Sequence, residues 1–170
     1  MSDFAHPLNL GQIRDGDRID LQADDAERAA IADRLRLPSL ERFEAHVALS
    51  REGDRVDAEG RIRARLEQSC VATGEPVATS VDEPFRLRFL PEPKTSAEEE
   101  VELSEDDCDT VFHDGAAIDL GSALTDTLAL ALDPYPRSAG ADQALREAGV
   151  LTEEQVSPFA VLAKLKRGER

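Results

Sequence analysis

Apolar and polar residues alternate along three consecutive segments of this sequence, and that period-two pattern constrains the fold more than any other feature. In the middle segment the apolar positions are Val56, Ala58, Ile62, Ala64 and Leu66. The positions between them are charged: Asp57, Glu59, Arg61, Arg63 and Arg65. Alternation over this length predicts a β-strand with one buried face and one solvated face.

The same pattern occurs upstream and downstream. Upstream, Phe43, Ala45, Val47 and Leu49 alternate with Arg42, Glu44 and His46; in residues 77–90, Val81, Phe85, Leu87 and Phe89 alternate with Arg86 and Arg88. Turn sequences at 52–54 and 73–76 separate the segments. We therefore expect an antiparallel β-meander with a single buried face. A second turn centred near Thr73-Gly74 would place Arg61 opposite Arg86 and Glu59 opposite Arg88.

Helical patterns flank these strands. Residues 24–36 carry acids in the first turn and arginine in the last, as the helix dipole favours, and Pro38 ends the helix. Residues 122–132 predict a second helix with Ser122 as its N-cap, while Asp119 is expected to cap this helix or its entry turn. Further helical turns are predicted at 142–149 and 158–165. The predicted fold class is α+β, with helices covering one face of the meander.

Length and composition restrict the class of protein. At 170 residues the chain fits a single domain over 1–170. No apolar run approaches the length of a membrane span, and the N-terminus lacks a basic region leading into an apolar one, so we expect a cytoplasmic protein without membrane contact. Two cysteines do not form a disulfide framework.

Half of the net charge of −16 lies in the segment 92–109, which holds nine carboxylates against Lys94 alone. Repulsion between like charges and the lack of apolar surface predict a long disordered acidic loop over 92–110. Two interpretations remain open: a solvated loop that keeps the protein soluble, or a functional element that binds a basic partner or mimics nucleic acid. The residues of such an element would include Glu98, Glu99, Glu100, Asp106 and Asp107.

The residue types needed for catalysis or metal binding do not occur in the spacings that those sites require. His6, His46 and His113 have no neighbouring cysteine or carboxylate at metal-ligand spacing, and there is no Cys-x-x-Cys pair. A phosphate loop, a dinucleotide fingerprint and a nucleophile elbow are also missing from the sequence. We predict no catalytic residues, no cofactor and no metal.

The arginines of the predicted sheet are the one basic concentration in an acidic chain. Arg61, Arg63, Arg65, Arg86 and Arg88 would share one face, at spacings suited to phosphate contact. The alternative is that Asp57, Glu59 and Glu67 neutralise them as an ordinary solvated surface. A pI near 4.5 argues against simple electrostatic binding of nucleic acid, and we expect no binding to DNA.

Four segments, in order, resemble the bacterial YceD family. They are residues 60–77 with QSCVATGEPV, 118–121 with IDLG, 128–137 with LALALDPYPR, and 158–162 with PFAVL. The turn from Cys70 to Pro76 and the Pro-Tyr-Pro-Arg ending most resemble the alphaproteobacterial branch. The resemblance implies a role in the accumulation of large-subunit ribosomal RNA, hence in ribosome biogenesis, without a known catalytic activity.

Many members of that family carry paired cysteines near the position of Cys70 and a second pair towards the C-terminus, which could bind a metal. This chain has Thr73 in place of the second cysteine and no cysteine between Arg137 and Gln155. The resemblance therefore implies no metal site here.

Together these observations favour a non-enzymatic assembly factor that docks large-subunit ribosomal RNA, or its precursor, on the arginines of the sheet. The acidic loop would limit non-specific RNA binding or hold a basic ribosomal protein. The competing hypothesis is an acidic adaptor or chaperone for such a basic partner, in which the arginines are ordinary surface residues. A third hypothesis, an uncharacterised enzyme, would need a pocket with convergent carboxylates.

Overall fold

The computed structural model describes residues 4–92 and 109–150, and these form two compact units. The larger unit comprises residues 4–68, 78–92 and 109–134; the smaller unit comprises residues 69–77 and 135–150. Whether 1–170 is a single domain stays a prediction. None of the described helices is long and apolar enough to cross a membrane.

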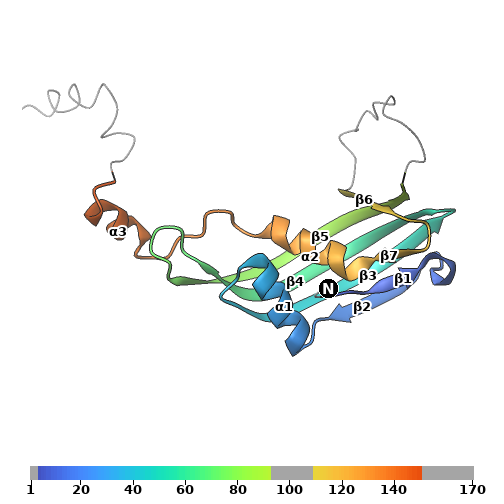
Figure 1. Cartoon of the computed structure of the whole chain (residues 1–170), viewed down its shortest axis with the longest axis horizontal. Coiled ribbons are helices and arrows are strands. Elements are labelled where there is room, and N and C mark those ends of the chain that lie inside the picture. The colour runs from blue at the N-terminus through green and yellow to red at the C-terminus, as the bar shows by residue number, and fades with distance from the viewer. Residues whose placement is uncertain (1–3, 93–108, 151–170) are drawn as a thin grey trace, which may run out of the picture. The chain divides into compact units, whose positions relative to one another are not determined.

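A five-stranded sheet in the order β2-β3-β4-β5-β6 dominates the larger unit (Figure 1). Its strands are β2 (Arg18–Gln22), β3 (Ser39–Glu52), β4 (Arg55–Ser69), β5 (Pro76–Pro91) and β6 (Asp109–His113). The three long central strands are those predicted by the period-two pattern. Phe43, Ile62 and Phe89 are fully buried on one face, while the alternate positions are exposed or half-buried. The predicted single buried face is confirmed.

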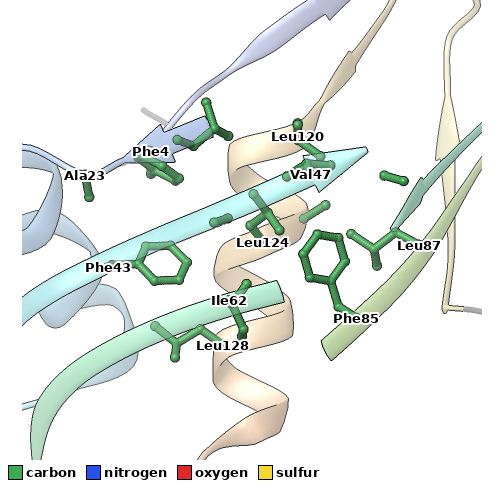
Figure 2. Packing of buried hydrophobic residues seen from close by; sticks show 14 of the residues in the cluster. Phe4, Ala23, Phe43, Val47, Ile62, Phe85, Leu87, Leu120, Leu124 and Leu128 are labelled. Atoms are coloured by element: carbon green, nitrogen blue, oxygen red, sulfur yellow. The ribbon is translucent and has the colours of Figure 1, made fainter. Parts of the chain in front are cut away.

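Two helices of the larger unit lie against the buried face of the sheet. Figure 1 shows α1 (Asp25–Leu35) and α2 (Leu120–Ala131) on the same side of the strands. In Figure 2, Leu124 and Leu128 of α2 point towards Phe43 and Ile62 of the central strands. A short two-stranded sheet of β1 (Pro7–Asn9) and β7 (Ala117–Asp119) precedes α2, and η1 (Leu10–Gln12) follows β1. The α+β class is confirmed.

Helix α1 forms where the sequence predicts it. The Asp24 carboxylate accepts from the Glu27 backbone N–H at 2.9 Å, and the Glu27 carboxylate accepts from the Asp24 N–H at 2.8 Å. This reciprocal capping satisfies two backbone donors that the first turn leaves without helical partners. The helix ends at Leu35, before Arg36 adopts a left-handed conformation and Pro38 prevents continuation.

Helix α2 begins two residues earlier than predicted, so Ser122 is not its N-cap. Asp119 is the N-cap, and its side chain accepts from the backbone N–H of Ser122 at 3.1 Å and from that of His6 at 3.1 Å. The earlier start brings fully buried Leu120 into the core as the first helical residue. The prediction that Asp119 caps this helix is confirmed.

The sheet is mixed, which corrects the prediction of a purely antiparallel meander. β2, β3 and β4 pair antiparallel, but β6 runs parallel to β5, with Leu87 opposite Asp109 and Pro91 opposite His113. Residues 93–108 connect these two strands, and a connection of a dozen or more residues allows parallel pairing. Sequence patterning missed β1, β2, β6 and β7, because three to five residues are too few to show a period of two.

The smaller unit consists of a tight turn, a segment without regular secondary structure and a short helix. The Cys70 N–H donates to the Glu75 carbonyl at 2.8 Å, and the Val71 N–H donates to the Pro136 carbonyl at 2.9 Å. Helix α3 (Ala141–Glu147) confirms the helical turn predicted at 142–149. The helix predicted at 158–165 and nearly all of the predicted acidic loop lie outside the described residues.

Candidate nucleic-acid interface

The five predicted arginines do share the solvated face of β4 and β5, which we call the arginine face. Arg61, Arg63, Arg65 and Arg86 are exposed, and Arg88 is half-buried. They lie on this face because Ile62, Ala64, Leu87 and Phe89, at the alternate positions, point into the core. The prediction of a common face is confirmed, but the contacts of the arginines differ from those expected.

Four of the five arginines form ion pairs with carboxylates of the same face. Arg61 and Arg63 both contact Asp82, the latter at 3.5 Å. Arg86 contacts Glu59 at 3.1 Å, and Arg88 contacts Asp57 at 3.0 Å. The alternative interpretation, that neighbouring acids neutralise these arginines, therefore holds for much of the face.

These pairs also correct the predicted register between β4 and β5. Arg86 lies beside Glu59 rather than Arg61, and Arg88 lies beside Asp57 rather than Glu59. The cause is the turn, which closes with the hydrogen bond between Cys70 and Glu75. Its centre is thus one residue before the predicted Thr73-Gly74, which shifts every cross-strand neighbour by two positions.

Two carboxylates of this face, Asp57 and Asp82, have pKa values below the ordinary value. Burial raises the pKa of Asp57, but the hydrogen bonds and charges of Arg55 and Arg88 outweigh it and leave that pKa below its usual value. The Arg61 hydrogen bond lowers the pKa of Asp82, with smaller effects from Arg61 and Arg63 charges. Because these acids stay ionised well below neutral pH, they compete with any anionic ligand for the same guanidinium groups.

Arg65 differs from the other four arginines. Within the described ranges 4–92 and 109–150 it has no ion pair. Its cross-strand partner is Arg42 of β3, which sequence reasoning placed on the solvated side of its strand but did not select as a binding residue. The signal that could have selected Arg42 is its own alternation with Phe43, which places it on the same face as the arginines of β4.

The side chains of His46 and His113 have hydrogen-bond partners in the larger unit. His46 Nδ1 lies 2.6 Å from the Asp20 carboxylate on the solvated face. His113 is buried, with Nε2 2.9 Å from the Asp54 carbonyl, while Nδ1 accepts from the Gly115 N–H. Across the portion of the chain that the structure describes, no group of three histidine, cysteine or acidic side chains could hold a metal ion.

Cys70 lies in a polar cluster in the smaller unit. Its thiol is buried, and hydrogen bonds from the Ser138 hydroxyl, the Ser138 backbone and the Thr73 hydroxyl lower its pKa from an ordinary 9.0 to about 6. The two hydroxyl groups lie 3.3 Å apart. These donors favour the thiolate because they stabilise its negative charge.

We expect the Cys70 thiol to titrate near pH 6 in the folded protein, measured as thiolate absorbance in a Cys108→Ser background. Cys70→Ser supplies the blank, and the unfolded chain should titrate near the ordinary value. Since the folded pKa is the lower one, this group's contribution to stability is fully present above about pH 9 and is lost as the pH falls through about 6. Thr73→Val and Ser138→Ala should each raise the midpoint; an unchanged midpoint in both would contradict the assignment of the donors.

The acidic residues predicted to bind a basic partner, Glu98, Glu99, Glu100, Asp106 and Asp107, lie outside the described residues. Three aspartates lie together in the larger unit, but two of them already have partners, because Asp119 caps α2 and Asp126 pairs with Arg34 at 2.6 Å. There a hollow of about 330 Å³ between β6, β7 and α2 has Phe89, Val111 and Ile118 in its lining, together with Asp114, Asp119 and Asp126.

Comparison with known proteins gives one match. A protein-family model described as "Large ribosomal RNA subunit accumulation protein YceD" matches residues 58–166, which contain all five arginines of the arginine face. That description names no catalytic activity. No curated protein and no solved structure matches the chain significantly. Because the family model covers well over half of its residues, the chain belongs to the YceD family, whose description links its members to the RNA of the large ribosomal subunit.

Proposed function

We propose that the protein is a non-enzymatic ribosome biogenesis factor that supports accumulation or processing of large-subunit ribosomal RNA by docking that RNA, or its precursor, on the arginine face. The observation that carries the proposal is the family match over residues 58–166, which includes β5 and the part of β4 that bears Arg61, Arg63 and Arg65. Assignment to the alphaproteobacterial branch stays a prediction, based on the Cys70–Pro76 turn and the Pro134–Arg137 segment.

The chemistry of the face is compatible with RNA and limits how tightly it can bind. One guanidinium group can donate two parallel hydrogen bonds to the oxygens of one phosphate. A row of arginines along a β-strand can therefore contact successive phosphates of an extended RNA strand. To bind RNA, most of these arginines would have to exchange a carboxylate partner for a phosphate. The net charge of −16 on the protein would also repel the RNA. We therefore expect modest affinity that falls steeply as salt rises.

The proposal predicts that RNA crosslinked to the tagged protein in its own cells is enriched in large-subunit precursor sequences. The double variant Arg63→Glu/Arg86→Glu should reduce that enrichment about tenfold, because it replaces two phosphate contacts with repulsive charges. A matched control is Arg14→Glu/Arg146→Glu, which changes the charge equally at exposed positions outside the sheet. Crosslinking and sequencing of the three proteins side by side is the measurement.

A second candidate function is an adaptor or chaperone for a basic partner such as a ribosomal protein. It is favoured by the nine carboxylates of segment 92–109. The same experiment separates the two functions. Recovery of basic ribosomal proteins without RNA, unchanged in the arginine variant, would contradict RNA docking and leave the adaptor.

A further inference from the structure

One part of the arginine face is hollowed. A shallow depression of about 150 Å³ opens between β3, β4 and β5, and its lining comprises Arg42, Arg63, Ala64, Arg65, Ser80, Val81 and Asp82. Ala64 and Val81 are buried, so the groups that solvent reaches there are mainly three guanidiniums, one hydroxyl and one carboxylate. On this measure a single water needs roughly 10–15 Å³, so the space is large enough for a small anionic group.

Two of these guanidinium groups, those of Arg42 and Arg65, carry like charges at directly opposite positions of neighbouring strands. Arg42 and Arg65 are direct cross-strand partners, next to a register shift between Leu40 and Arg42. Directly opposite side chains of like charge destabilise a pair of strands unless an anion lies between them. In the described structure no carboxylate joins this pair, because Arg42 contacts Glu44 along its own strand.

The arginines around the hollow keep donors free for a ligand. Arg65 has no ion pair among the described residues. Arg42 directs Nε and one terminal nitrogen to a single oxygen of Glu44, at 3.0 and 2.7 Å, so N–H groups remain on the other terminal nitrogen. The contact of Arg63 with Asp82 is long, at 3.5 Å, and Asp82 is held more closely by Arg61.

We infer that this hollow, lined by Arg42, Arg63, Arg65 and Ser80, binds one backbone phosphate of single-stranded RNA. Guanidinium forks and a serine hydroxyl are donors that proteins use for phosphate oxygens. Such a contact fixes the position of the strand without reading its sequence. The inference rests on the proposed RNA docking, and it assigns the main contact to one end of the arginine face rather than to all five arginines equally.

The test is fluorescence anisotropy of the full-length protein with a short, labelled single-stranded RNA of mixed sequence over a series of salt concentrations. Arg65→Gln should weaken binding about tenfold, because it removes a charged hydrogen-bond donor from the hollow. It should also make the slope of log K against log salt shallower by about 0.7, the value for one lost phosphate contact on a single strand. Arg18→Gln removes the same charge from β2 on the same side of the sheet and should change affinity by no more than about twofold.

The outcomes separate the hollow from the broader proposal. Equal losses in Arg65→Gln and Arg18→Gln would overturn the hollow as the main contact while leaving RNA docking on this face intact. No RNA binding by the unaltered protein would overturn both. A parallel titration with inorganic phosphate tests whether the hollow binds a free anion instead of RNA. Phosphate binding that needs Arg65, without RNA binding, would overturn the RNA assignment.

Discussion

Leu124→Ala is expected to lower the free energy of unfolding by about 3–4 kcal/mol. Leu124 is fully buried in the middle of α2, and Figure 2 shows it among Phe43, Val47 and Ile62 of the central strands. The substitution loses the free energy gained by burying the leucine side chain. It also leaves a cavity that α2 and the sheet cannot close, which costs packing energy. Chemical unfolding in urea, followed by circular dichroism, should show the midpoint falling by about 1–2 M.

Leu130 provides the matched control in the same helix. Its side chain is 77% exposed, so Leu130→Ala deletes the same atoms from a position that is already in contact with solvent. The free energy of unfolding should change by less than about 0.5 kcal/mol. Alanine has the higher helix propensity of the two residues, so neither variant should lose stability through propensity. Comparable losses in the two variants would contradict the packing of Leu124 against the sheet. A large loss confined to Leu124→Ala would support that packing.

Much of the sheet could be predicted from the sequence because its central strands are long. β3, β4 and β5 each span at least 14 residues, and a period of two repeated over that length leaves no helical alternative. The same pattern correctly assigned the arginines to one face. It could not predict β6, whose parallel pairing depends on a long connection rather than on local sequence.

The alternation of polar and apolar residues could not predict the side-chain contacts of the candidate site. Which acid lies beside which arginine depends on the register of β4 against β5, and a turn centred one residue earlier moves every neighbour by two. The pairing of Arg42 with Arg65 likewise depends on a register shift in β3, and no residue type in the sequence indicates that shift. The sequence therefore predicts the face, while tertiary pairing decides which of its arginines remain available.

Gly121→Ala is expected to destabilise the protein by about 2–3 kcal/mol, although helix propensity alone predicts the opposite sign. In an isolated helix, alanine is favoured over glycine by about 1 kcal/mol. Gly121 lies in the first turn of α2, however, and a Cβ there would come within 1.9 Å of the Phe4 carbonyl oxygen. The backbone of residues 4–6 cannot easily yield, because the Leu120 N–H donates to the His6 carbonyl at 3.1 Å and Asp119 holds the His6 N–H.

The substitution therefore forces α2 away from the N-terminal segment, and such overpacking outweighs the gain in propensity. Gly11→Ala is the matched control, because a Cβ at Gly11 meets no atom within 4 Å and its backbone is not in the left-handed region. Urea unfolding of both variants beside the unaltered protein gives the answer. If Gly121→Ala were as stable as the unaltered protein or more so, the close approach of α2 to Phe4 would be wrong, and Leu120 would lose the constraint that places it in the core.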